Sequence, residues 1–212
     1  IWLDSPLKHD EWFSRLFKEA VEIPGQATDA LCRAAKAADV HVVMGMNEKV
    51  PTNMGTMWNT NVIIDRHGSI LGKHRKLVPT FAEKMIWSRG DGSGINVWNT
   101  DIGKLGTLAC GENSNTLARY ALLAQGEQVH VANYPAIGLG SKLGQNRWIH
   151  LRAGAHSCEG KLFTIVSTSS VSQEMVDMLG TTEEKRQFML DANPYSAIYD
   201  PNGEVLASLE NE

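Results

Sequence analysis

Cysteine is scarce in this chain, and the three that occur form neither a metal pattern nor a disulfide pattern. Cys32, Cys110 and Cys158 are odd in number among 212 residues, and no two of them have C-x-x-C spacing. This argues against a disulfide framework and a structural zinc site and fits a reducing compartment, so we expect a cytoplasmic protein. Cys32 and Cys158 are expected to be small buried thiols that serve packing.

The chain also lacks a large excess of either charge and any long apolar run. Lys and Arg number 20 against 24 Asp and Glu, which gives a net charge of −4. A chain with this net charge does not have the excess of basic residues that binding to nucleic acid or to an anionic membrane requires. No apolar run approaches the roughly 20 residues of a membrane-spanning helix. We therefore expect a small-molecule partner, with no nucleic acid and no membrane, and a single domain over residues 1–212.

Cofactor and metal motifs are absent as well. The glycine-rich run Gly90–Gly94 lacks G-x-G-x-x-G spacing, and it lacks the strand before it and the helix after it that a dinucleotide site needs. His74, His130, His150 and His156 are expected on different elements, without ligand spacing. The sequence therefore predicts neither a cofactor nor a metal site.

What is present is an alternation of helical and extended patterns. Helical spacing is found over Asp10–Val21, Asp29–Ala38 (with Thr28 as the expected N-cap), Thr116–Gln125 and Gln145–His156. Strands are expected over Val40–Met46, Gln128–Ala132 and Phe163–Ser167. Hairpins are expected to join Met57–Ile64 to Ser69–Leu71, Trp98–Thr100 to Lys104–Ala109, and a last pair that starts at Ser196–Tyr199. These patterns indicate an α/β fold of mixed sheets covered by helices.

The segment from Thr107 to Asn115 carries the strongest chemical signal. An apolar run, expected to be a buried strand, ends in Cys110, and glycine and polar residues follow before a helical pattern begins at Thr116. A cysteine in such a strand-to-helix turn is exposed at the carboxyl edge of a sheet, with backbone N–H groups directed at the atom it attacks. Taken alone, however, a cysteine at a strand end is more often a small buried hydrophobic residue.

A second segment, Gly72–Glu83, reads GKHRKLVPTFAE and places a basic triplet before a proline and a carboxylate. By composition alone the triplet is a solvated charge cluster and Glu83 is a surface acid. Together, the two segments closely resemble the nitrilase superfamily of carbon–nitrogen hydrolases, and within it the nitrilase branch. Four further stretches follow that family's order: MGMNEK at Met44, WSRGDGS at Trp87, GEQVHVANYP at Gly126 and RAGAHSCEGK at Arg152. The resemblance implies a four-layer αββα sandwich and a homo-oligomer whose subunits pair through helices beside the active site.

The resemblance also assigns roles to individual residues of this chain. It implies that Cys110 is the nucleophile, Lys76 the catalytic lysine, and Glu83 a second glutamate that lines the pocket and positions substrate or lysine. The expected reaction uses water to convert a small organic nitrile to a carboxylic acid and ammonia through a covalent thioimidate and thioester. The pocket residues that it implies are Gly111, Glu112, Asn113, Tyr134 and Pro135.

One residue of the family's active site is not found in this sequence. The general base is a glutamate in a strand that precedes a Pro-Gly-Tyr-Pro-like turn, and the resemblance begins after it. We therefore expect residues 1–212 to be a fragment that lacks the first strand-helix-strand region and the end of the C-terminal part. A cyanide hydratase, an amidase, and a catalytically incompetent assembly member, binding member or fragment stay open as alternatives.

Overall fold

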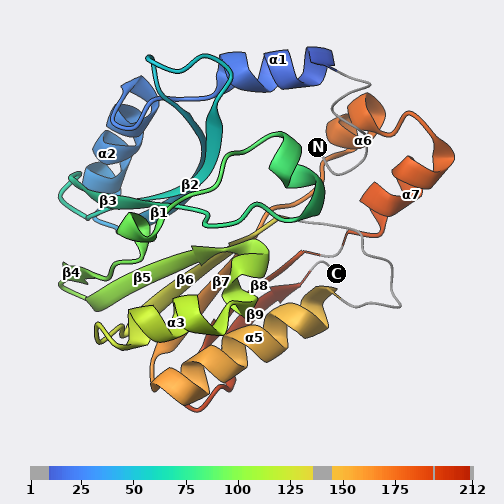
Figure 1. Cartoon of the computed structure of the whole chain (residues 1–212). Helices are drawn as coiled ribbons and strands as arrows, with labels where there is room; N and C mark the ends of the chain where they lie inside the picture. Colours follow the sequence, from blue (N-terminus) through green and yellow to red (C-terminus); the bar gives the residue numbers. More distant parts are fainter. Residues whose placement is uncertain (1–9, 136–144, 193, 211–212) are drawn as a thin grey trace.

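Two β-sheets lie face to face in the computed structural model, and helices cover the outer side of each sheet (Figure 1). The structure describes residues 10–135, 145–192 and 194–210. From one side to the other, the layers are α1 with α2, a three-stranded sheet, a six-stranded sheet, and α3 with α5. This arrangement confirms the expected α/β class and the four-layer αββα sandwich.

The smaller sheet is a pair of consecutive hairpins in the order β1-β2-β3, with bounds β1 (Val42–Lys49), β2 (Met57–Ile64) and β3 (Ile70–Arg75). The turn between β2 and β3 forms because the carboxylate of Asp65 accepts backbone N–H groups of His67 and Ser69, at 3.0 and 2.8 Å. Two helices cover the outer face, α1 (Asp10–Glu19) and α2 (Gln26–Ala38). Ala35 of α2 belongs to the same buried cluster as Val62 and Ile64 of β2.

The larger sheet is mixed and has the order β4-β5-β6-β7-β8-β9. Its central strands β5, β6 and β7 are parallel, and the remaining neighbours are antiparallel. The bounds are β4 (Trp98–Thr100), β5 (Gly103–Ala109), β6 (Val129–Tyr134), β7 (Phe163–Thr168), β8 (Tyr195–Tyr199) and β9 (Val205–Glu210). Because β5 and β6 are parallel, the residues that follow them, Cys110 and Pro135, come out at the same edge of the sheet.

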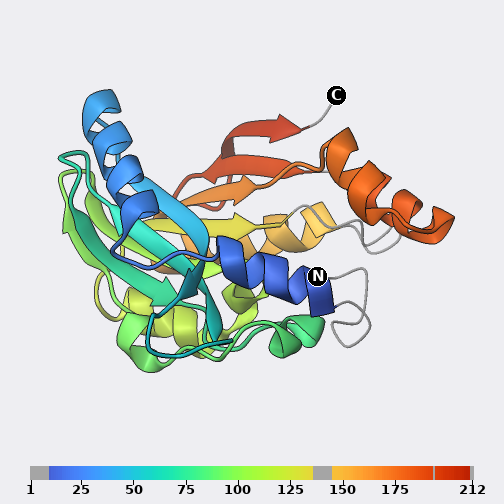
Figure 2. The ribbon, with the colours of Figure 1, turned by 90° about the horizontal axis from the view of Figure 1, so that it is seen from above.

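Helices α3 (Thr116–Leu123) and α5 (Gln145–Gly160) cover the outer face of the larger sheet (Figure 1). Ile149 and Ala153 of α5 pack into a buried cluster with Ala132 of β6. Two further helices, α6 (Gln173–Leu179) and α7 (Glu183–Leu190), extend together from one end of the molecule, as Figure 2 shows. The short helical turns are η1 (Phe81–Met85), η2 (Gly92–Gly94) and η3 (Cys110–Ser114). No helix in the described ranges is long and apolar enough to span a bilayer.

Two local expectations from the sequence are wrong. The N-cap of α2 is Gly25 and not Thr28, because the helix begins at Gln26 and the Thr28 hydroxyl bonds back to the backbone N–H and carbonyl of Gly25. Cys158 is exposed and not buried, because α5 presents Ile149, Ala153 and His156 to the interior and leaves Cys158 outside. Cys32 is partly buried and packs against the cluster under α2, as expected.

Candidate active site

Cys110 sits in a strained turn directly after β5. Its φ is 55°, in the left-handed region that residues other than glycine rarely adopt. Such a conformation costs about 1 kcal/mol or more and persists only where neighbouring contacts enforce it. The structure therefore has the strand-to-helix turn that the sequence predicts at Cys110, with η3 and then α3 following the cysteine.

Two side chains of the same turn hold it in place. The Asn113 amide donates to the carbonyl oxygens of Leu108 and Cys110, at 3.2 and 2.9 Å. The Glu112 carboxylate accepts the backbone N–H of Ala109 at 3.0 Å. Both side chains are buried. Glu112 and Asn113 thus fix the backbone of the cysteine and of the two residues before it.

Lys76 and Glu83 come together as a buried ion pair. Lys76 follows the end of β3, and its Nζ lies 2.6 Å from Oε2 of Glu83, which lies in η1. The same carboxylate oxygen accepts the backbone N–H of Thr80 at 2.5 Å. Only 1% of Lys76 and 2% of Glu83 are exposed. The basic triplet is therefore not a solvated cluster, since its lysine points into the protein and bonds to the carboxylate that the sequence singles out.

A cavity of about 410 Å³ joins these elements. Cys110, Glu83, Tyr134 and Pro135 line it, so the structure brings together four of the residues expected at the site. Amide side chains come from both sheets, namely Asn47, Asn59 and Asn61 from the smaller and Asn133 from the larger. Asn61 donates to Thr107 of the facing sheet at 2.8 Å and accepts from Asn133 at 3.3 Å.

Gly111, Glu112 and Asn113 are not among the described residues that line this cavity. The expectation that Glu112 and Asn113 face substrate differs from where the structure places them, because their polar atoms are bound to backbone groups and histidines. Gly111 contributes its backbone N–H, which lowers the pKa of the Cys110 thiol. These three residues build the turn and do not form the pocket wall.

The surroundings of Cys110 do not by themselves ionise the thiol. Burial raises the pKa of Cys110 above its ordinary value, and the Glu83 carboxylate raises it further. The Lys76 ammonium, the Gly111 N–H and Arg152 lower it, but not enough to reverse the shift. Burial also raises the pKa of Tyr134 beside it. Cys110 is a free thiol, and it requires a base to become a nucleophile at neutral pH.

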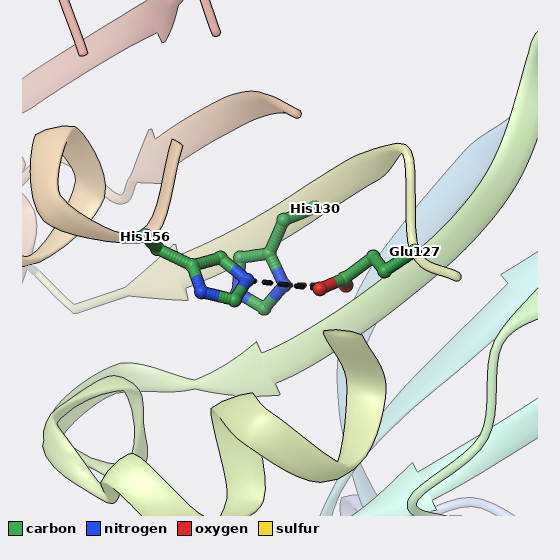
Figure 3. A group of neighbouring side chains, drawn as sticks. All are labelled: Glu127, His130 and His156. Atoms are coloured by element: carbon green, nitrogen blue, oxygen red, sulfur yellow. Dashed lines mark hydrogen bonds and ion pairs between the residues drawn. The ribbon is translucent and has the colours of Figure 1, made fainter. Parts of the chain in front are cut away.

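A second buried group of ionisable side chains lies behind the turn and was not predicted. Figure 3 shows the Glu127 carboxylate facing two adjacent imidazoles, with its oxygens 2.7 Å from His130 Nδ1 and 2.8 Å from His156 Nε2. The other ring nitrogen of His130 lies 2.8 Å from Asn113 Oδ1. The sequence places His130 and His156 on different elements, β6 and α5, but the fold brings their ring centroids to 4.4 Å.

The atoms of Glu127, His130 and His156 that could bind a metal ion lie within 4.8 Å of one another. One carboxylate and two imidazoles are a donor set that zinc accepts. Each of the contacting atoms is nevertheless already in a short hydrogen bond inside the group. The group therefore has the geometry of a hydrogen-bonded support behind the cysteine turn. The i, i+3 spacing of Glu127 and His130 is the one local signal in the sequence that could have indicated it.

The family model and the curated relatives that match this chain all belong to the carbon–nitrogen hydrolases. The family model described as carbon–nitrogen hydrolase matches residues 11–212. Nitrilase 3 of an unknown prokaryotic organism is 41% identical over 155 residues, which cover 73% of this chain and 46% of that protein. The nitrilase of Paraburkholderia phymatum is 36% identical over 193 residues, which cover 91% of this chain and 55% of that protein. The chain spans about half the length of these two curated relatives.

A solved structure has the same fold. It is a glutamate-to-glutamine mutant of the amidase from Nesterenkonia sp. AN1, described as showing covalent addition of the acetamide moiety of fluoroacetamide at its active-site cysteine. It superposes with a TM-score of 0.69 at 17% identity, covering 88% of this chain and 63% of the amidase chain. At this identity, the similarity supports the fold alone.

Proposed function

Because the chain belongs to the carbon–nitrogen hydrolase family, we propose that it forms the catalytic domain of an enzyme that hydrolyses a small organic nitrile to a carboxylic acid and ammonia. One observation carries the proposal. Cys110, in a left-handed turn, lines the same cavity as Glu83, and the Glu83 carboxylate holds the ammonium group of the buried Lys76. A nucleophile, a cation and a carboxylate are the groups that addition to a carbon–nitrogen bond requires.

In the first step, the Cys110 sulfur attacks the nitrile carbon. A carbon–sulfur bond forms, one carbon–nitrogen π bond opens, and the nitrogen takes up the proton that the thiol loses, which gives a thioimidate. Burial keeps the pKa of the thiol high, so a general base must accept that proton. Since the Glu83 carboxylate already accepts from Lys76 and from the Thr80 N–H, we assign it to positioning the lysine. The family resemblance implies that this base is a glutamate other than Glu83.

In the second step, water adds to the thioimidate carbon to form a tetrahedral intermediate. The Lys76 ammonium is the cation for the developing negative charge, and the Gly111 N–H beside the sulfur is a second donor. Loss of ammonia leaves a thioester, and a second water hydrolyses it to the acid and the free thiol. The roles of Cys110, Lys76 and Glu83 belong to the proposal.

Amide hydrolysis is the second candidate reaction, because a cysteine, a lysine and a carboxylate in this arrangement can also act on an amide carbonyl. An amide would enter the same sequence at the tetrahedral intermediate and pass through the same thioester. Expulsion of the sulfur from that intermediate would instead release an amide from a nitrile. Whether the carbon–nitrogen or the carbon–sulfur bond of the intermediate breaks therefore separates nitrilase from hydratase behaviour.

We further propose that the protein is a homo-oligomer. Two apolar side chains on the outer face of α3, Leu117 and Tyr120, are 79% and 68% exposed. They border a hollow between α3 and the end of α5, which Arg119 and Glu159 also line. An exposed apolar surface of this kind is typical of a contact between subunits.

The proposed reaction is tested with the natural protein that contains residues 1–212. Aliphatic nitriles, arylacetonitriles and the matching amides are supplied, and ammonia, acid and amide are measured. We expect acid and ammonia from at least one nitrile, and we expect loss of this activity in Cys110→Ala but not in Cys158→Ala, because Cys158 is exposed on α5. Turnover by Cys110→Ala above about 1% of the parent rate would refute the proposed mechanism.

A further inference from the structure

The Glu112 carboxylate connects the two segments that hold the candidate catalytic residues. Its Oε1 accepts the backbone N–H of Leu77 at 2.7 Å, and Leu77 directly follows Lys76. Its Oε2 accepts the backbone N–H of Ala109 at 3.0 Å, and Ala109 directly precedes Cys110. One buried side chain thus binds the neighbour of the lysine with one oxygen and the neighbour of the cysteine with the other.

A third group, the His74 imidazole, bonds to the same carboxylate. His74 Nε2 lies 2.7 Å from Oε2 of Glu112, and His74 Nδ1 lies 3.1 Å from the carbonyl oxygen of Gly94. A carbonyl oxygen and a carboxylate can only accept, so both ring nitrogens must donate. A histidine that donates from both nitrogens is an imidazolium. His74 is fully buried, so its positive charge has the Glu112 carboxylate as its counter-charge.

From this geometry we infer that Glu112 and His74 form a buried carboxylate–imidazolium pair that fixes the position of Lys76 relative to Cys110. Glu112 is a positioning residue, because it acts through the backbone of Leu77 and Ala109 and does not line the cavity. His74 keeps the carboxylate ionised, so that both oxygens remain acceptors. The inference rests on the proposed function for its relevance to catalysis, but the pair itself does not depend on the substrate.

The electrostatics of Glu112 agree with this arrangement. Burial raises the pKa of its carboxyl, yet the hydrogen bond and charge of His74 and the two backbone N–H groups hold the pKa below its ordinary value. A neutral carboxylic acid or an amide would place a donor opposite an N–H group of Leu77, Ala109 or His74 that the carboxylate now accepts. The ionised form is therefore the one that satisfies all three donors.

The decisive variant is Glu112→Gln, with Glu48→Gln as its matched control. Glu48 is also a buried carboxylate that accepts several hydrogen bonds, but its side-chain partners are Thr60, Lys73 and Arg75. It makes none of the backbone contacts that join the lysine and cysteine segments. Neutralising Glu48 thus measures the general effect of losing a buried carboxylate in this fold.

The readout is the rate at which iodoacetamide alkylates Cys110, measured across pH by peptide mapping so that Cys32 and Cys158 are counted separately. The charged groups that act on the Cys110 thiol are Lys76, Glu83 and Arg152. If Glu112 holds Lys76 near Cys110, Glu112→Gln raises the apparent pKa of the thiol. A rise of half a unit lowers the alkylation rate at neutral pH by about threefold. Glu48→Gln should leave the profile unchanged.

A double variant separates positioning from general destabilisation. In a Lys76→Met background, Glu112→Gln should produce no further change in the Cys110 profile, because the effect passes through the lysine. An unchanged profile in Glu112→Gln, or an equal change with and without Lys76, would overturn the inference. A shifted profile in a protein that hydrolyses no nitrile would leave the inference standing and refute the proposed function.

A measurement on the unmodified protein covers the case in which Glu112→Gln does not fold. In protein labelled with ¹⁵N, both ring nitrogens of His74 should show the shifts of a protonated imidazolium. His74→Gln, which keeps one donor toward Glu112 but removes the charge, identifies the signal by its loss. The shifts of a neutral tautomer at His74 would contradict the inference.

Discussion

Lys76 and Glu83 form an ion pair with 2.6 Å between Nζ and Oε2, and both residues are almost completely removed from water. Burying two charges is unfavourable unless they pair closely, and removing one partner leaves the other uncompensated. This buried pair lies beside the cavity that Cys110 lines, because Glu83 lines the same cavity. We interpret the pair as a device that places one compact positive charge beside the reacting carbon.

The first prediction concerns the shape of the cationic group at position 76. Lys76→Arg should lower kcat/KM for nitrile hydrolysis by at least about 10²-fold, nearly as much as Lys76→Ala, because a planar guanidinium cannot occupy the place of an ammonium. Ammonia release measures the effect, and circular dichroism checks the fold. Lys73→Arg is the matched control, since Lys73 lies in β3 and binds the carboxylate of Glu48 in β1. Near-parental activity in Lys76→Arg would leave Lys76 without a catalytic role.

The neighbouring residue of the triplet is predicted to serve stability instead. The Arg75 guanidinium bonds to both carboxylate oxygens of Glu48, at 2.9 and 2.6 Å, and lies 3.9 Å from the centroid of the Trp58 ring. Because the pair is partly exposed to solvent, we expect Arg75→Ala to lower the free energy of unfolding by roughly 1–2 kcal/mol. Activity per folded molecule should change by less than about threefold. Urea unfolding and steady-state kinetics on one sample distinguish the two effects, and a large loss of kcat with normal stability would contradict this assignment.

Acid should destabilise the protein through Glu127 and His156. Burial raises the pKa of Glu127, but His130 and His156 hold it below its ordinary value, while burial lowers the pKa of His156. For both groups the folded value lies below the unfolded one, so the unfolded state binds protons first and stability falls as pH falls. The loss should begin near pH 6.5 for His156 and continue below about pH 4.3 for Glu127.

Urea midpoints between pH 8 and pH 3.5 measure this dependence. Glu127→Gln leaves two buried imidazoles without their acceptor and should cost about 3 kcal/mol or more at neutral pH. The exposed Glu204 is the control, and Glu204→Gln should follow the parent curve. A midpoint that does not change between pH 7 and pH 5 would mean that folding does not lower the pKa of His156.

The fourth prediction concerns Phe81, which starts η1 with a φ of 49° while 83% of the residue is exposed. Glycine adopts this conformation freely, and little apolar contact is lost with the exposed ring. Phe81→Gly should therefore raise stability by about 1 kcal/mol, or roughly 2–4 °C in Tm for a chain of this size. Phe81→Ala keeps the strain and should not raise it. If the two variants lower Tm equally, the phenyl ring makes contacts that outweigh the backbone strain.

The sequence predicted those features that depend on neighbouring residues. The strand-to-helix turn at Cys110 and the hairpins on either side of Asp65–Gly68 and Asp101–Gly103 follow from local apolar spacing and turn residues, and the structure has them. The pairing of Lys76 with Glu83 was expected only from the family resemblance, because composition alone makes both residues surface charges. Local sequence patterns thus predict the turns, and the family resemblance predicts which residues form the candidate site.

The sequence does not predict contacts between residues that are distant along the chain, and it does not predict which side of a helix is exposed. His74 meets Glu112, and His156 meets Glu127, only because the sheets and α5 bring separate segments together. The sequence predicts Glu112 as a pocket residue, because its position close to the nucleophile cannot reveal which way its carboxylate turns. It predicts a buried Cys158, although α5 leaves this residue exposed. In each case the outcome depends on packing, which spacing along the chain does not determine.

The central claim is that the Cys110 sulfur bonds to the substrate carbon, and acid-quenched mass spectrometry during nitrile turnover tests it most directly. The natural protein that contains residues 1–212 is mixed with excess nitrile, quenched within the first turnovers, digested and mapped. We expect an added mass equal to the thioimidate or the thioester on the peptide that contains Cys110, and no added mass on Cys32 or Cys158. An added mass on another residue, or continued turnover in Cys110→Ala, would contradict it.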